Sequence, residues 1–213
     1  MTLAEPVGAP GPRSTPIAQI SRSAIRANIS ALALASSAAV GVAADAFGHG
    51  RDEVAELARD AGLAVDDGGL AFAEAVLGLV PGSTPAMRLS GTVLSVKALR
   101  AGEGVSYGYL HRAARDTRIA LVVGGYAQGI VRELGGRASV AVAGERHCIV
   151  GRVAMDVCVV DVGDAAVSRG DEVVFFGDPA RREPGVGEWV EATGLTALEL
   201  VTVVGLRALR EWM

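Results

Sequence analysis

The spacing of the apolar residues changes near residue 85, and this change constrains the fold more than any other feature of the chain. Before it, apolar residues recur with the helical period of 3.6 residues. After it they alternate with a period of 2, which is typical of strands. Proline and glycine within Gly82–Pro85 mark the boundary. The sequence therefore predicts an α+β protein with a helix-rich part over 17–84 and a strand-rich part over 85–213.

Three helical patterns occupy the helix-rich part, with short strand candidates between them. The first helix places Ile25, Ile29 and Leu32 on one face, and Ser21 or Ser23 can cap its amino end. Strands and helices in alternation predict βα units. The other expected helices are Asp52–Ala61 and Leu70–Leu79, and the expected strands are Ile17–Ile20, Ala39–Val42 and Leu63–Val65.

The strand-rich part contains many short alternating runs separated by Gly, Asp and Pro. Runs of this kind predict an antiparallel sheet that closes into a barrel or a sandwich. The expected strands are Thr92–Ala98, Arg118–Val123, Ser139–Ala143, Gly151–Val162, Glu172–Phe176 and Glu199–Val204.

Composition excludes several classes of protein. No window holds 18 uncharged apolar residues, so we expect no membrane span. The net charge of −4 disfavours a nucleic-acid partner. Cys148 and Cys158 form neither a disulfide framework nor a metal quartet, so we expect no metal site and a reducing, cytoplasmic location. Residues 1–16 combine Pro and Gly and are expected to be a disordered lead-in.

One detail of the composition restricts the chemistry that the chain can perform. The sequence has 20 basic residues, and Lys97 is the only lysine among them. A reaction that needs a lysine side chain must use Lys97. This residue lies in a predicted strand, on the face that we expect to meet solvent.

Three motifs in the strand-rich part, taken in order, resemble the C-terminal β domain of alanine racemases. They read Gly-Val-Ser-Tyr-Gly at 104–108, Gly-Tyr-Ala-Gln-Gly at 125–129 and Ile-Val-Gly-Arg-Val-Ala-Met-Asp at 149–156. Further upstream, Val42–Gly50 resembles the segment of that family that carries the lysine of pyridoxal 5′-phosphate (PLP). Ala43 stands at the position of that lysine.

The resemblance implies a bacterial enzyme family in which PLP-dependent interconversion of L- and D-alanine supplies peptidoglycan precursors. Its members have a (β/α)₈ barrel followed by the β domain. Such a barrel needs roughly 250 residues, which exceeds the whole chain of 213 residues. We therefore expect a partial βα fragment of the barrel, with the middle of the barrel missing, followed by an antiparallel β-barrel-like domain.

The resemblance also assigns roles to residues of the β domain. Tyr107 stands at the position of the family's tyrosine base. Plainer alternatives stay open: Tyr107 as an aromatic residue on a sheet, Met155 as a core residue, and the arginines as surface residues. The implied substrate-binding residues are Met155 and Asp156, and the implied entrance residues are Tyr126, Arg132 and Arg152.

The cofactor half of the resemblance is incomplete. Ala43 cannot form an imine, and Phe47 lacks the hydroxyl of the family's phosphate-contacting tyrosine. Leu198 stands where the family commonly has a second tyrosine on the phosphate side. We therefore predict that the chain has no PLP and no catalytic activity alone.

Three functions remain open. The chain is a non-catalytic relative, an interaction module, or a working alanine racemase. As a module it would form a homo- or hetero-dimer, for example with a full-length racemase to which it offers Tyr107. A βα fragment with open sheet edges would also favour association.

Overall fold

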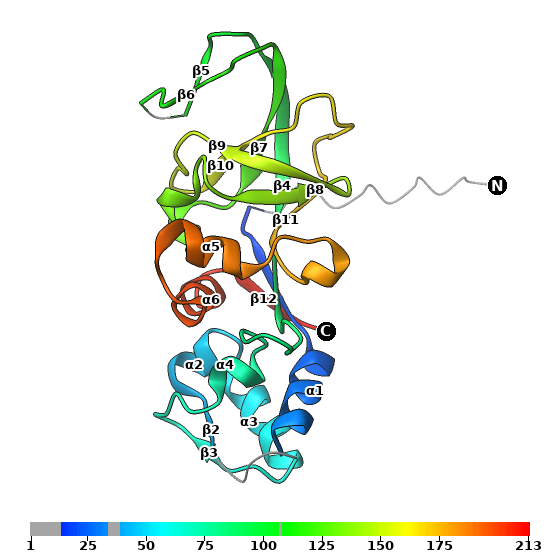
Figure 1. Cartoon of the computed structure of the whole chain (residues 1–213), viewed down its shortest axis with the longest axis vertical. Helices are drawn as coiled ribbons and strands as arrows, with labels where there is room; N and C mark the ends of the chain where they lie inside the picture. The colour runs from blue at the N-terminus through cyan, green and yellow to red at the C-terminus, as the bar shows by residue number, and fades with distance from the viewer. Residues whose placement is uncertain (1–13, 34–38, 107) are drawn as a thin grey trace, which may run out of the picture.

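The computed structural model describes residues 14–33, 39–106 and 108–213, so the predicted lead-in lies almost entirely outside the described residues. Figure 1 shows an upper barrel and a lower group of helices, with α5 (Val186–Thr193) and α6 (Ala197–Gly205) between them. No helix within the described ranges is long and apolar enough to cross a membrane. The predicted α+β class is confirmed.

The barrel is a closed antiparallel sheet. Its strands follow the order β11-β8-β9-β10-β7-β4, and a further pairing of β11 with β4 closes the ring. Alternate residues point inward, so Val140 and Val142 of β8 are buried whereas Ser139 is half-buried. The strands are β4 (Met87–Leu99), β7 (Thr117–Val123), β8 (Ser139–Val142), β9 (Glu145–Val150), β10 (Val157–Asp161) and β11 (Glu172–Phe176).

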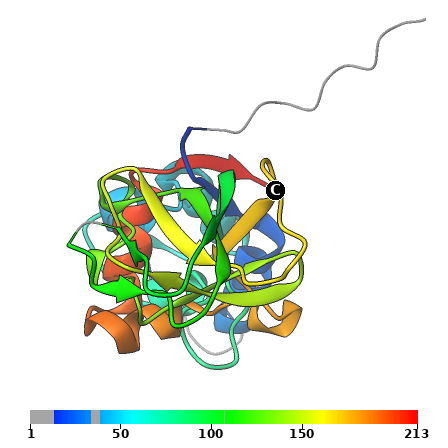
Figure 2. The ribbon, with the colours of Figure 1, turned by 90° about the horizontal axis from the view of Figure 1, so that it is seen from above.

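The first strand of the chain joins this sheet. β1 (Ile17–Ile20) forms where the sequence predicts a strand, and it pairs antiparallel with the first residues of β4. Its other edge pairs in parallel with β12 (Leu209–Trp212). Figure 2 shows β1 in blue and β12 in red next to each other at one side of the barrel. The strand belongs to the β domain's sheet because β4, at 13 residues, extends beyond the ring.

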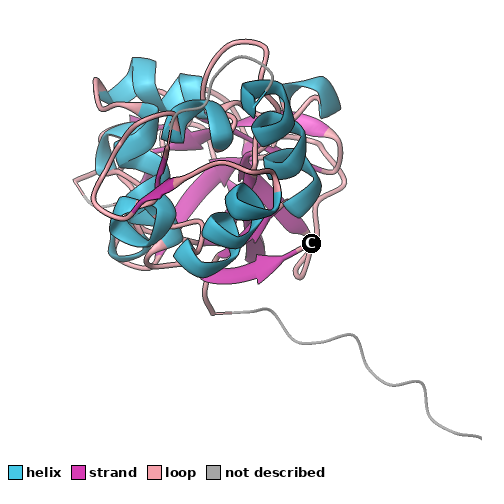
Figure 3. Ribbon diagram, turned by 90° about the horizontal axis from the view of Figure 1, so that it is seen from below, coloured by secondary structure: helices cyan, strands magenta, loops and turns pink. Residues whose placement is uncertain are grey.

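The rest of the helix-rich part forms a small βα fragment. Figure 1 shows its helices gathered at the end of the molecule away from the barrel, and Figure 3, seen from below, shows helices in front of the strands. The only strand pair within its described residues is the parallel pair β2–β3. The elements are α1 (Arg22–Ala33), β2 (Val40–Gly41), α2 (Ala43–Phe47), α3 (Arg51–Asp60), β3 (Val65–Asp66) and α4 (Ala73–Val76).

The fragment covers the edge of β2 that we expected to be open. On that side the Gly41 N–H donates to the Ala71 carbonyl at 2.8 Å. A Cβ atom on Gly41 would lie only 2.3 Å from the Gly69 carbonyl oxygen, so the loop lies directly against the strand. The expectation of an open edge is wrong here, because the chain folds back over β2.

Asn28 connects α1 to the loop that leads into β4. Its Nδ2 donates to the carbonyls of Val76 and Thr84, at 3.0 and 2.9 Å. Its Oδ1 accepts the Thr84 N–H at 2.9 Å. Asn28 is 7% exposed, so these groups have little access to water. The side chain therefore joins the helix to both ends of the 76–84 loop.

Three local predictions differ from the structure. The residues Glu199–Val204, expected to form a strand, are part of helix α6. Thr196 and Glu199 form a capping box that starts this helix. The long run Gly151–Val162 is a strand only over β10, after a turn in which Gly151 has a φ of 67°. The helix expected over Leu70–Leu79 is reduced to the short α4.

The α2 segment is a left-handed turn. Ala44, Asp45, Ala46 and Phe47 all have φ between 48° and 60°, a region that costs an L-residue about 1–2 kcal/mol. Asp45 holds the turn: its Oδ1 accepts the backbone N–H of the first residue of α3 at 2.8 Å, and its Oδ2 accepts from Arg210 of β12 at 2.6 Å.

His49 follows this turn and is fully buried. Its Nδ1 lies 3.1 Å from the Phe47 carbonyl oxygen, whereas its Nε2 has no hydrogen-bond partner within the described residues. Burial lowers the pKa of His49 to about 4. The imidazole is therefore neutral in the folded protein at neutral pH, which fits a structural residue.

Replacing Asn28 with alanine should lower the free energy of unfolding by about 2–4 kcal/mol, because partly buried backbone groups lose their partners. Urea denaturation measures this loss. Ser30→Ala, at an exposed position of the same helix, should change stability by less than about 0.5 kcal/mol. Equal effects of the two substitutions would contradict the proposed role of Asn28.

His49 should make the fold less stable as the pH falls. The unfolded chain takes up a proton near pH 6.5 but the folded protein only near pH 4, so stability decreases between these values by about 3 kcal/mol. In urea titrations across this range, His49→Gln should lose less stability than the parent. The other histidines and the carboxylates are common to both proteins. Parallel pH profiles would show that the prediction is wrong.

Candidate functional site

Tyr107, the predicted catalytic residue, lies outside the described residues. Its neighbour Ser106 has a φ of 64° and donates from Oγ to the Arg152 carbonyl at 2.6 Å. This bond attaches the hairpin of β5 (Gly104–Val105) and β6 (His111–Arg112) to the loop between β9 and β10. The β9–β10 loop also carries both predicted substrate-binding residues.

Met155 and Asp156 lie in this loop and not in a strand. Met155 is 55% exposed, which excludes the alternative that it is a core residue. Asp156 accepts from Gln128 Nε2 at 3.0 Å, and Gln128 Oε1 accepts the Gly125 N–H at 2.9 Å. The Gln128 side chain therefore links the turn around Tyr126 to the loop that carries the predicted substrate-binding residues.

The three predicted entrance residues lie close together. The Arg132 guanidinium lies 4.4 Å from the centre of the Tyr126 ring, a cation–π contact. Arg132 and Arg152 line one concavity of about 520 Å³. Arg137 lines it too, which the sequence analysis missed. The concavity carries more positive than negative charge, since Glu133 is the acidic residue in its wall.

The close approach of two glycines accounts for this grouping. A Cβ atom on Gly135 would lie 1.8 Å from the Gly151 carbonyl oxygen. The loop with Arg132 and Arg137 can therefore lie against the loop with Arg152 only because position 135 has no side chain. The glycine-rich run Gly135-Gly136 is the sequence signal for this contact, although it does not name the partner loop.

The segment that resembles the PLP-lysine segment presents no group that would hold the cofactor. Ala43 is half-buried and offers a methyl group. Phe47 is 4% exposed and offers a phenyl ring. Leu198 lies on α6, the helix against which α2 packs, and it packs against the apolar core. The side chains at these positions include no amine and no hydroxyl, so they do not fit PLP.

Lys97 lies elsewhere in the fold. It is exposed on β4, opposite Ile119 of β7, whereas α2 packs against α6. It lines a cavity of about 160 Å³ together with Ser95 and Ser106. The position of Lys97 on the solvent face agrees with the sequence prediction.

The remaining reactive groups are histidine, cysteine and carboxylate side chains. Within the described ranges, no group of three His, Cys, Asp or Glu side chains is arranged to hold a metal ion. Cys158 is buried, and burial raises its pKa to about 12, so its thiol is not ionised at neutral pH. Cys148 is an exposed free thiol.

Comparison with known proteins identifies relatives of the β domain. The alanine racemase of Thermobifida fusca (strain YX) is 45% identical over 131 residues, which cover 62% of this chain and 35% of that protein. The alanine racemase of Mycobacterium leprae (strain TN) is 44% identical over 147 residues, covering 65% of this chain and 38% of that protein. The chain thus matches only about a third of the length of these relatives.

Solved structures share the fold. The alanine racemase of D-cycloserine-producing Streptomyces lavendulae matches with a TM-score of 0.81 at 22% identity, covering 97% of this chain and 98% of that one. The alanine racemase of E. faecalis matches with a TM-score of 0.81 at 18% identity, covering 94% and 98%.

The family model described as "Alanine racemase, C-terminal domain" matches residues 86–212. This stretch contains the complete barrel and is more than half of the chain. The protein therefore belongs to the alanine racemase C-terminal domain family.

Proposed function

We propose that this chain is an alanine racemase-like protein that binds no PLP and does not racemise alanine by itself. The observation that carries the proposal is the identity of residue 43. In the segment that resembles the family's PLP-lysine segment, the lysine position is occupied by Ala43, which has no amine. Phe47 and Leu198 support it, because both lack the hydroxyl expected at their positions.

The chemistry of racemisation explains why this loss matters. A proton must leave Cα on one face of the substrate and another must arrive on the opposite face. Each acid–base group works only within hydrogen-bond reach of its own face. PLP supplies the electron sink that makes this proton acidic. Tyr107 could serve one face, but Ala43 stands at the position of the lysine for the other face, and Lys97, the sole lysine, lies on β4.

The comparisons support an interior deletion. Sequence matches to the relatives cover about a third of their length, whereas the structural match to the Streptomyces lavendulae racemase extends over 98% of that chain. A chain that keeps the beginning of the barrel and the whole β domain, without the middle, accounts for both values. The remaining cofactor contacts would belong to the missing strands.

Incubation with PLP should produce no stoichiometric covalent adduct. The measurement is the absorbance of a protein-bound imine, followed by borohydride reduction and intact-mass analysis. Lys97→Arg is the matched control, because it removes the sole lysine and keeps the charge. A stoichiometric adduct on the parent chain would overturn the proposal and favour a working racemase. If Lys97→Arg abolished that adduct, it would identify Lys97 as the attachment point.

A second candidate function is an interaction module that pairs with a full-length alanine racemase and offers Tyr107 to it. The observation that favours it is a set of exposed apolar residues around the candidate site. Tyr109 and Leu110 are 65% and 67% exposed, and Met155 is 55% exposed. Exposed apolar surface next to polar residues is typical of protein interfaces. Leu110 shares its concavity with Arg132 and Arg152.

If the module exists, the chain should comigrate with a full-length alanine racemase in size-exclusion chromatography. Met155→Asp should weaken this binding at least tenfold, because it places a charge in the contact. Met213→Asp is the matched control, since Met213 is equally exposed (56%) but lies at the end of β12. Absence of a complex, or equal weakening by both substitutions, would exclude this version of the module.

A further inference from the structure

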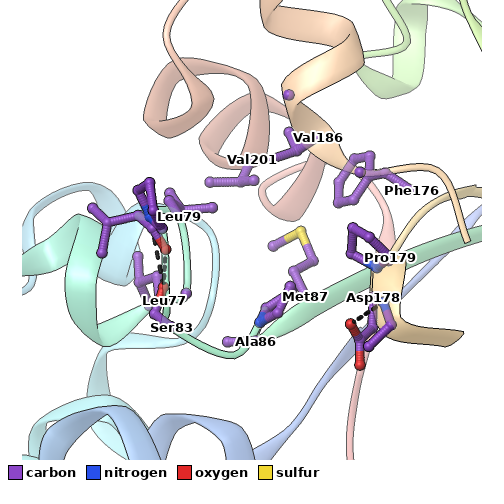
Figure 4. A pocket seen from close by; sticks show the side chains of 18 of the residues that line it. Leu77, Leu79, Ser83, Ala86, Met87, Phe176, Asp178, Pro179, Val186 and Val201 are labelled. Atoms are coloured by element: carbon purple, nitrogen blue, oxygen red, sulfur yellow. Dashed lines mark hydrogen bonds between the residues drawn. The ribbon is translucent and has the colours of Figure 1, made fainter. Parts of the chain in front are cut away.

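A cavity of about 440 Å³ lies where the βα fragment meets the β domain (Figure 4). One wall is the segment 77–87, which leads from α4 into β4. The second wall is formed by residues 176–187, between β11 and α5, and Val201 of α6 closes a third side. Two parts of the chain that are distant in sequence, 77–87 and 176–201, therefore border it.

The lining of this cavity is apolar, and its polar side chains are engaged. Ser83 Oγ donates to the Val80 carbonyl at 2.6 Å, and Asp178 Oδ1 accepts the Ala180 N–H at 2.9 Å. Among the residues that the structure describes, no lysine, arginine or histidine lines it. The main apolar side chains are Leu77, Leu79, Met87, Phe176, Val186 and Val201, several of which Figure 4 shows converging on the space.

Backbone hydrogen bonds fix the walls. The Ala86 N–H donates to the Leu77 carbonyl at 3.1 Å, which closes the first wall into a loop. The Gly177 N–H donates to the Pro184 carbonyl at 2.9 Å, which closes the second. The backbone groups of these bonds are not free to pair with an added peptide strand.

Water has little access to the deepest lining atoms. Met87, Phe176 and Val201 are 4%, 2% and 1% exposed, although they border the cavity. Apolar side chains at the base of a pocket favour contact with a small apolar molecule over contact with water. A volume near 440 Å³ lies within the range of small-molecule sites.

We propose that this cavity is a binding site for a small, uncharged, apolar molecule, aromatic or branched aliphatic. Burial of the ligand's apolar surface against these side chains drives the binding. The absence of a free basic side chain in the wall disfavours an anion. The site is separate from the loops that carry the predicted catalytic and entrance residues, and it does not depend on the function proposed above.

Fluorobenzene is a suitable probe, followed by ¹⁹F NMR titration of the full chain. We expect saturable 1:1 binding, and benzoate, which is similar in size but charged, should bind at least tenfold more weakly. Val201→Phe should weaken fluorobenzene binding at least tenfold by filling the cavity. Val203→Phe, on an exposed position of the same helix, should leave it unchanged.

Gly187→Leu provides a second test in case Val201→Phe does not fold. An added Cβ at Gly187 has no atom within 4 Å, so the new side chain can enter the space without a clash of its Cβ. It should also weaken binding at least tenfold. Unsaturable binding, equal affinity for benzoate, or unchanged affinity in the folded cavity variants would overturn the proposal.

Discussion

The pairing of β4 with β11 is the constraint on which the rest of the molecule depends. It closes the barrel, and the early residues of β4 that extend past the ring also receive β1. Arg88 of β4 stabilises the β4–β11 pairing. Its guanidinium contacts Glu172 of β11 at 2.6 Å and Glu183 at 2.8 Å. These carboxylates raise the pKa of Arg88, which is mostly buried, so its charge is retained and paired. Chain segments from both ends thus share one sheet.

The left-handed turn of α2 is held in place by contacts with distant parts of the chain. Strained backbone is usually found where function requires it and where the surroundings enforce it. Two contacts hold this turn in its strained conformation. Arg210 contacts Asp45 at 2.6 Å, and Gly48 lies so close to Gly205 that neither position has room for a Cβ atom. Ala43 and Phe47 place a methyl group and a phenyl ring in this segment, so under the proposed function the strained backbone is kept without the amine and the hydroxyl of the family's lysine and tyrosine.

Sequence reasoning predicted the features that local pattern determines. The alternation identified Glu172–Phe176 at its observed bounds, and the resemblance named Tyr126 and Arg132, whose side chains are in contact. It failed where distant contacts decide. The alternating run Glu199–Val204 indicated a strand, but a capping box starts a helix there. The partner of Ile17–Ile20 depends on the length of β4, and the position of Arg137 depends on the meeting of two loops.

Hydrogen exchange at the α-carbon of alanine tests the central claim most directly, because it detects proton abstraction even without net racemisation. L-alanine would be incubated in D₂O with the purified chain and PLP, and the loss of the α-proton followed by ¹H NMR. The account predicts the same rate as with PLP alone. Catalytic exchange that disappears in Tyr107→Phe would show that the chain still performs the family's chemistry, in contradiction to the account.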